Sequence, residues 1–166
     1  MNENLRVGDR APEFKAMAVG GKYADGREIS LKELRGSAVV LYFYPKDDTP
    51  GCTVQACGLR DSWDDLEDRG ELFGVSVDPV ASHEKFISKY KLPFPLLSDP
   101  EQKIVQAYGV WVEKSMYGKK YMGTERTTFV IDDHGVISAI FRKVKPEEHV
   151  EILRKALKES DPKKKK

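Results

Sequence analysis

Apolar runs of strand length alternate with helical periodicities from residue 37 onward. The run Val39-Val40-Leu41-Tyr42-Phe43 predicts a strand over residues 38–44, and a second apolar run predicts a strand over 72–77. The residues between these two runs predict a helix over about 52–69. This order of strand, helix and strand is typical of an α/β fold.

A second helix is expected after residue 77, because Phe86, Ile87 and Tyr90 fall at helical spacing and Ser82 is a suitable cap. Prolines 93 and 95 end that helix. The remaining pattern predicts a strand at 95–98, a helix at 100–108, a hairpin of strands at 127–131 and 136–141, and a last helix at 146–158.

The first 36 residues follow a different pattern. After an irregular lead over 1–12, apolar positions at 14–19 and 23–30 are separated by glycines, which predicts a hairpin. Ser30 and Glu33 form a capping-box pattern and predict a short helical turn. We therefore expect one α/β domain over residues 1–160, with a central sheet flanked by helices and an N-terminal hairpin extension.

Composition excludes several partner classes. The net charge of the 166 residues is only +1, from 28 basic and 27 acidic side chains, so we expect no nucleic-acid partner. No apolar stretch reaches the ~18 residues of a membrane span, and the first residues lack a secretory signal. We therefore expect a cytoplasmic protein without a membrane partner, and a disordered basic tail over residues 161–166.

The two cysteines, Cys52 and Cys57, are the most informative residues. A reducing compartment disfavours a permanent disulfide and leaves catalysis, redox sensing, metal binding or plain burial. Metal binding is least favoured, because C-x4-C is not the usual C-x2-C and the three histidines lack ligand spacing. We expect neither a metal nor another cofactor.

Cys52 falls where the predicted strand ends and a helix begins. Unpaired backbone N–H groups and the helix dipole favour an anion there, so the sulfur is a candidate nucleophile. Pro50-Gly51 predicts a tight turn at the surface with a reachable sulfur, and Asp47 and Asp48 are expected to face solvent. The alternative is an inert thiol that packs as a small apolar side chain.

The segment around Cys52 resembles a known active-site signature. Pro45-x3-Thr49-x2-Cys52, within residues 42–53, is similar to the signature of peroxiredoxins, and Cys57 five residues later is similar to the bacterioferritin comigratory protein/PrxQ subgroup. Further matching segments extend the resemblance over most of residues 5–158. They are Gly58-Leu59-Arg60-Asp61, Leu96-Leu97-Ser98-Asp99, Gly109-Val110-Trp111, Glu113-Lys114 and Arg126-x2-Phe129-x-Ile131-Asp132.

The resemblance implies a thioredoxin-like fold with a mixed sheet, and a peroxidase in which Cys52 attacks a peroxide oxygen and becomes a sulfenic acid. Thr49 would hydrogen-bond to the sulfur and the peroxide, and Pro45 would limit water access. An arginine must also lie nearby to favour the thiolate and hold the oxygens. The motif match assigns this role to Arg126, which by position alone reads as an exposed cation at a strand end.

The resemblance also implies that Cys57 resolves the sulfenic acid; otherwise it is a small buried helix residue. On a continuous helix, residues five apart are rotated by about 140° and their Cα atoms lie roughly 8.5–9 Å apart. That separation exceeds the ~7 Å limit for a disulfide, so the start of the helix must unwind before the bond closes.

The expected activity is therefore the reduction of hydrogen peroxide and organic hydroperoxides by a monomer that thioredoxin or a similar dithiol recycles. Two other readings stay open. One is a thiol–disulfide oxidoreductase, against which C-x4-C and Thr49 weigh. The other is a redox-sensing binding module in which the two cysteines reshape a partner surface.

Overall fold

The computed structural model describes residues 5–160 and contains a seven-stranded mixed sheet. Its order is β2-β1-β5-β4-β3-β8-β9, in which β3, β4 and β5 are parallel and the other pairs are antiparallel. The strands are β1 Lys15–Gly20, β2 Tyr23–Ser30, β3 Val39–Phe43, β4 Glu71–Ser76, β5 Leu96–Ser98, β8 Thr128–Ile131 and β9 Ile137–Phe141.

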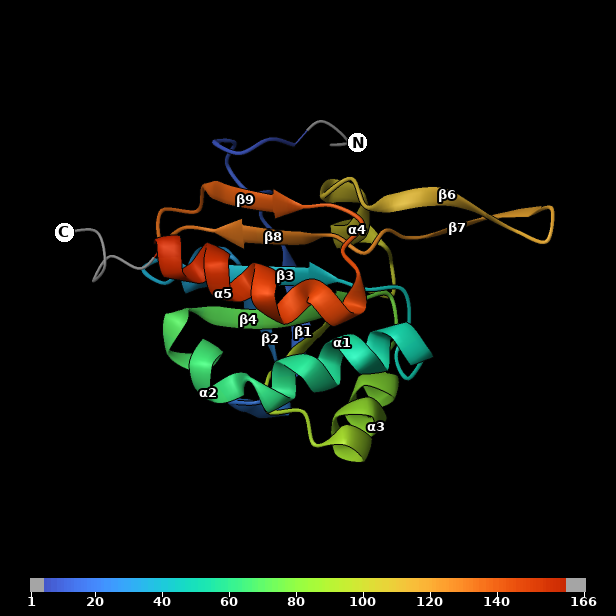
Figure 1. The fold of residues 1–166 in the computed structure, drawn as a ribbon, viewed down its shortest axis with the longest axis horizontal. Helices are drawn as coiled ribbons and strands as arrows, with labels where there is room; N and C mark the ends of the chain where they lie inside the picture. Colours follow the sequence, from blue (N-terminus) through green and yellow to red (C-terminus); the bar gives the residue numbers. More distant parts are fainter. Residues whose placement is uncertain (1–4, 161–166) are drawn as a thin grey trace.

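Helices cover both faces of this sheet. They are α1 Pro50–Asp61, α2 Trp63–Leu66, α3 Val80–Tyr90, α4 Lys103–Ala107 and α5 His149–Ser160, with short 3₁₀ turns η1 Lys32–Leu34, η2 Glu67–Arg69 and η3 Pro146–Glu148. Figure 1 shows α1 and α5 side by side across one face. The predicted central mixed sheet with flanking helices is therefore confirmed.

The alternation of side chains along β3 explains why two separate cores form. Leu41 and Phe43 point to one face and pack with residues of α4, whereas Val40 and Tyr42 point to the other face and pack with residues of α1, α3 and α5. Every residue of β3 is buried. A strand buried on both faces reads as a continuous apolar run, as this one does.

The N-terminal hairpin belongs to the sheet itself. β1 pairs with β2 as predicted, but it also pairs with β5, with Met17 opposite Ser98. The predicted N-terminal hairpin is therefore confirmed, and it extends the central sheet at one edge. Sequence patterns gave no sign of the pairing with β5, since it joins strands about 80 residues apart.

Three predicted helices differ from those observed. The helix expected over 52–69 begins at Pro50 and is interrupted at Ser62, after which α2 and η2 follow. The helix expected at 100–108 is confined to α4, because Gln102 has a left-handed φ of 58°. Ser82 does not cap α3, which begins at Val80; its hydroxyl instead donates to Asp47.

A second hairpin, β6 Trp111–Met116 and β7 Lys119–Thr124, was not predicted. It forms its own two-stranded sheet and projects from the body of the molecule (Figure 1). Four of its apolar side chains, Met116, Tyr117, Tyr121 and Met122, are exposed. A hairpin that buries no complete face lacks the alternation by which strands are recognised in a sequence.

Two further expectations concerned a membrane span and the basic C-terminal tail. Within residues 5–160, no helix has the length and apolar content needed to cross a membrane. The predicted basic tail at 161–166 lies outside the described residues.

Candidate active site

Cys52 lies in the first turn of α1, directly after the loop that follows β3. Thr49 precedes this helix with an extended backbone (φ −97°, ψ 156°), and its carbonyl oxygen accepts the backbone N–H of Thr53 at 2.8 Å. Pro50 occupies the first helical position, where its fixed φ is favourable and its missing N–H costs nothing. Cys52 therefore lies at the N-terminal, positive end of a 12-residue helix.

Arg126 reaches this sulfur because of the sheet register. β8 runs antiparallel to β3 with Thr128 opposite Tyr42, so the residues just before β8 lie beside the residues just after β3. The Arg126 Nη2 donates to Cys52 Sγ at 3.5 Å. The structure thus brings together two predicted site residues that are 74 positions apart.

A buried glutamine and histidine continue from the guanidinium. Arg126 Nη1 donates to Gln55 Oε1 at 2.6 Å, and Gln55 Nε2 lies 3.1 Å from His149 Nδ1. The other ring nitrogen, Nε2, lies 2.9 Å from Thr128 Oγ1. Burial, and then the nearby positive charge of Arg126, lower the pKa of His149 to about 3, so the imidazole is neutral at pH 7.

Gly51 provides the space that Arg126 occupies. A Cβ at this position would lie 3.1 Å from Arg126 Nη2 and 3.5 Å from Pro146 Cγ. The first of these distances is shorter than ordinary van der Waals contact. Any side chain at residue 51 would therefore push the guanidinium away from its place beside the sulfur.

Gly51→Ala should consequently lower the second-order rate constant of Cys52 with hydrogen peroxide by about tenfold, because small displacements of a positioned group are costly. Stopped-flow fluorescence of the reduced protein measures this rate. Gly58→Ala is the matched control, because Gly58 lies on the same helix as Gly51. A Cβ at residue 58 would meet only Val150 Cγ2, at 3.4 Å. Equal rates for the two variants would show that Gly51 does not position Arg126.

Thr49 and Pro45 also lie in the loop before α1, and both are partly buried. The Thr49 hydroxyl donates to the Lys46 carbonyl oxygen at 2.9 Å, so in this structure its single proton is not directed at the sulfur. Its oxygen keeps lone pairs that can accept a hydrogen bond from a peroxide. The catalytic roles of Thr49 and Pro45 stay predictions.

The sulfur is more enclosed than expected. Cys52 is only 2% exposed and belongs to the apolar cluster between α1 and the sheet. The prediction of a solvent-reachable sulfur in a surface turn is therefore wrong for this reduced state. The reason is that the first turn of α1 packs its Cys52 side chain inward, against the apolar cluster.

Cys57 lies on the same continuous helix and is partly buried, and both cysteines are free thiols. With α1 intact over Pro50–Asp61, helical geometry keeps their Cα atoms roughly 8.5–9 Å apart. The structure is therefore that of a reduced protein in which the disulfide has not formed.

Asp47 is buried, which corrects the expectation that it faces solvent. It is 7% exposed and accepts hydrogen bonds from the Tyr44 hydroxyl at 2.6 Å, Ser82 Oγ at 2.8 Å and His83 Nδ1 at 2.7 Å. Burial, and then the charge of Asp47, raise the pKa of Tyr44, which keeps this hydroxyl a donor. Asp48, in contrast, is exposed as predicted and pairs with Lys89.

His83 is a further buried member of this group. Its Nε2 lies 2.9 Å from the carbonyl oxygen of Leu97, which can only accept, and its Nδ1 faces the Asp47 carboxylate. Nε2 therefore donates to Leu97, and Nδ1 shares a short buried hydrogen bond with the Asp47 carboxyl group. This pair ties the loop before Cys52 to α3 and β5.

Asp47, Asp78 and His83 also place three possible metal-ligand atoms within 4.8 Å of one another. Hydrogen bonds already account for these atoms. Both His83 nitrogens are in hydrogen bonds, and Asp78 Oδ2 accepts from the Asp47 backbone N–H at 2.8 Å and from Ser76 Oγ at 2.7 Å. The arrangement is that of a closed structural network.

A pocket of about 600 Å³ opens beside Arg126 at the base of the β6–β7 hairpin. Lys114, Glu125, Lys143 and Val144 contribute to its lining. Burial, and then the charge of Arg126, lower the pKa of Lys114. Because Arg126 both lines this pocket and contacts the sulfur, the pocket is the candidate entry for a peroxide.

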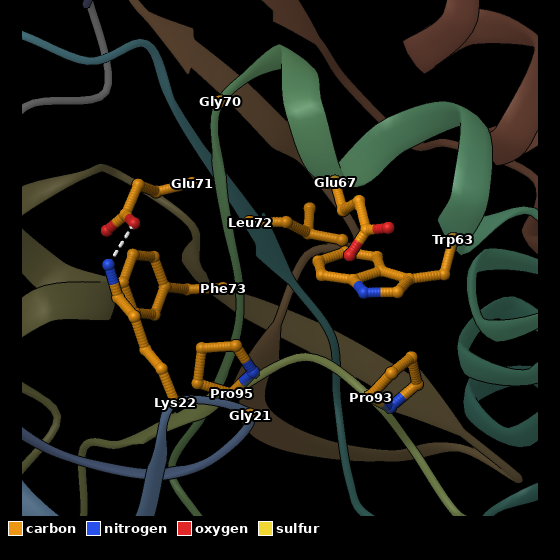
Figure 2. A pocket seen from close by; sticks show the side chains of 10 residues that line it. All are labelled: Gly21, Lys22, Trp63, Glu67, Gly70, Glu71, Leu72, Phe73, Pro93 and Pro95. Carbon is orange, nitrogen blue, oxygen red and sulfur yellow. Dashed lines mark hydrogen bonds and ion pairs between the residues drawn. The ribbon is translucent and has the colours of Figure 1, made fainter.

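A second pocket, of about 260 Å³, contains none of the predicted site residues. Figure 2 shows the side chains of Trp63 and Leu72 along one part of it and the Lys22–Glu71 ion pair along another. Glu71 begins β4, whereas Cys52 follows the end of the parallel strand β3, so this pocket lies toward the opposite end of the sheet. Neither Cys52 nor Arg126 lines it.

Four residues of the site were not assigned from the sequence: Gln55, Asp47, His83 and His149. Gln55 could have been found, because it lies one helical turn after Cys52 and so shares its face. The two histidines carry no local signal, since their partners are distant in the chain. The contact between Gln55 and His149 spans 94 positions, and the contact between Asp47 and His83 spans 36.

Comparison with known proteins agrees with this geometry. The AhpC/TSA family model matches residues 7–140. A bcp protein of Coxiella burnetii is 50% identical over 148 residues, covering 89% of this chain and 95% of its own, and the peroxiredoxin Bcp of Bacillus subtilis is 41% identical over 160 residues, covering 96% and 99%. A structure concerned with the alkyl peroxide reduction activity of Xanthomonas campestris bacterioferritin comigratory protein has a TM-score of 0.80 at 34% identity, covering 88% of this chain and 90% of that one.

A thioredoxin-like mixed sheet with a cysteine at the start of a helix and an arginine beside it defines a thiol-dependent peroxidase of the peroxiredoxin class. The chain belongs to the AhpC/TSA family, within the bacterioferritin comigratory protein/PrxQ subgroup of peroxiredoxins. The predicted thioredoxin-like fold and peroxiredoxin family are therefore confirmed.

Proposed function

We propose that this peroxiredoxin reduces hydrogen peroxide and organic hydroperoxides through Cys52 and Cys57, in the manner of an atypical two-cysteine enzyme. The observation that carries the proposal is the Arg126 guanidinium, 3.5 Å from the Cys52 sulfur at the start of α1. The activity of the Xanthomonas campestris relative toward alkyl peroxides supports the inclusion of organic hydroperoxides.

In the first step the Cys52 thiolate attacks one peroxide oxygen. An S–O bond forms as the O–O bond breaks, and the departing oxygen takes a proton to become water or an alcohol. The sulfur is oxidised to sulfenic acid while the peroxide is reduced. Arg126 stabilises the thiolate before the attack and the negative charge that moves to the departing oxygen during it.

In the second step Cys57 attacks the sulfenic sulfur. An S–S bond forms, and the sulfenic oxygen leaves with a proton as water. The first turns of α1 must unwind for this bond to close, because an intact helix holds the two residues too far apart. Unwinding also separates Gln55 from Arg126, so the oxidised state loses the arrangement that binds peroxide.

Thioredoxin or a similar dithiol would then reduce the disulfide by thiol–disulfide exchange. The dithiol donates two electrons, leaves as its own disulfide, and allows α1 to reform. The cytoplasmic location, the monomeric state and the identity of the reductant are further parts of this proposal. The sequence and the resemblance to the family support these parts.

Stopped-flow mixing of the reduced protein with hydrogen peroxide tests the chemistry. Wild type and Cys57→Ser should both oxidise far faster than free cysteine, and Cys52→Ser should not. Mass spectrometry should find a Cys52–Cys57 disulfide in wild type and a sulfenic acid in Cys57→Ser. Oxidation no faster than free cysteine would reject the proposal, and turnover of a disulfide substrate in its place would identify a thiol–disulfide oxidoreductase.

A further inference from the structure

His149 is a buried residue of α5 that no step above uses. It is 0% exposed, and so is Gln55, its partner on α1. Through Gln55 and Arg126, hydrogen bonds connect its ring to the sulfur of Cys52, with heavy-atom distances of 3.1, 2.6 and 3.5 Å along the way. Thr128, also 0% exposed, ends this chain of contacts on β8.

The donors and acceptors in these hydrogen bonds allow only one orientation of the Gln55 amide. A guanidinium only donates, so the Gln55 atom that faces Arg126 must be the amide oxygen. The Gln55 amide nitrogen therefore faces His149, and because an amide nitrogen only donates, His149 Nδ1 must carry a lone pair. The ring proton then lies on Nε2 and points to the Thr128 hydroxyl oxygen.

The contact with Arg126 excludes the reversed arrangement. Turning the Gln55 amide over would place its NH₂ group against the Arg126 guanidinium, so that two donors would face each other at 2.6 Å. The charged and titratable groups around the ring agree with a neutral histidine, because Arg126 adds positive charge and Tyr42, 5.3 Å away between ring centroids, has a pKa raised by burial. A neutral ring is the form that can accept from Gln55.

We propose that His149 is a positioning residue for the peroxide reaction, whose Nδ1 lone pair fixes the Gln55 amide so that the amide oxygen holds Arg126 against Cys52. The proposal rests on the proposed function. His149 touches neither the sulfur nor the substrate and acts through Gln55. Thr128 has a supporting role, because its hydroxyl oxygen can accept the proton that this tautomer places on Nε2.

Two substitutions separate positioning from packing. His149→Leu removes both ring nitrogens, whereas His149→Asn places an amide oxygen near the position of Nδ1 and can still accept from Gln55. We expect His149→Leu to lower the second-order rate constant with hydrogen peroxide by about tenfold, the effect of one lost hydrogen bond. His149→Asn should stay within about threefold of wild type.

Thr128→Val and Thr127→Val form a matched pair, because both residues are 0% exposed and adjacent, but only Thr128 contacts His149. Thr127 Oγ1 donates to Glu125 instead. We expect Thr128→Val to lower the rate several-fold and Thr127→Val to leave it unchanged. Thermal unfolding of each reduced variant verifies that the rates are measured on folded protein.

The outcomes distinguish this inference from the proposed function. A wild-type rate no faster than that of free cysteine would reject the proposed function. A fast wild type with an equally fast His149→Leu would reject the positioning role, and so would His149→Asn if it were as slow as His149→Leu. Nitrogen-15 NMR of the His149 ring gives a readout independent of activity, and a proton on Nδ1 at pH 7 would overturn the proposal.

Discussion

Replacing Arg126 with methionine should lower the second-order rate constant with hydrogen peroxide by roughly 10²–10³-fold, the effect of removing one preorganised donor at a reacting centre. The guanidinium contacts the sulfur through Nη2 and uses Nη1 to hold Gln55, so methionine removes both interactions. Arg126→Lys should recover only part of the rate, because an ammonium keeps the charge but not the planar fork of donors. Stopped-flow oxidation of the reduced variants measures these rates.

Arg142→Met is the matched control for this prediction. Arg142 is another arginine near the site, 38% exposed, and it pairs with Glu125 at 3.5 Å. Its loss should leave the peroxide rate unchanged, because it makes no contact with the sulfur. If Arg126→Met reacted within threefold of wild type, Arg126 would have no catalytic role and the peroxide would have to be held by other groups.

Asp47→Asn should lower the free energy of unfolding by about 1–3 kcal/mol, the cost of leaving a buried polar group without its hydrogen-bond partner. The asparagine replaces the carboxyl group that lies 2.7 Å from His83 Nδ1, in a site where His83 is 0% exposed. It also turns an NH₂ group or a neutral oxygen toward the donors of Tyr44 and Ser82. Unfolding in urea, with an unchanged m value, measures the loss.

The neighbouring residue provides the control for this substitution. Asp48 has a left-handed φ of 55°, which asparagine tolerates, and its carboxylate pairs with Lys89 at the surface. Asp48→Asn should therefore leave the free energy of unfolding almost unchanged, because exposed ion pairs contribute little. Equal losses for the two variants would show that the buried hydrogen bonds of Asp47 do not stabilise the fold.

Most of the central sheet could be predicted because its strands carry their own signal. β3 is buried on both faces and reads as an unbroken apolar run, and α5 presents Leu153, Ala156 and Leu157 on one face. The pairing of β1 with β5 and the existence of β6 and β7 could not be predicted. The first depends on strands that are distant in the chain, and the second on a hairpin that buries too little apolar surface to leave a pattern.

The site residues also differ in whether local sequence or tertiary contacts determined their placement. The sequence by itself determined that Cys52 begins a helix after a buried strand, because strand periodicity, Pro50 and the helix start are local properties. The tertiary structure alone decided that Arg126 meets the sulfur, that Asp47 pairs with His83, that His149 faces Gln55, and that the sulfur is enclosed. These contacts join residues 36 to 94 positions apart, and the register of the sheet and the packing of helices on it, rather than any local propensity, set which of them meet.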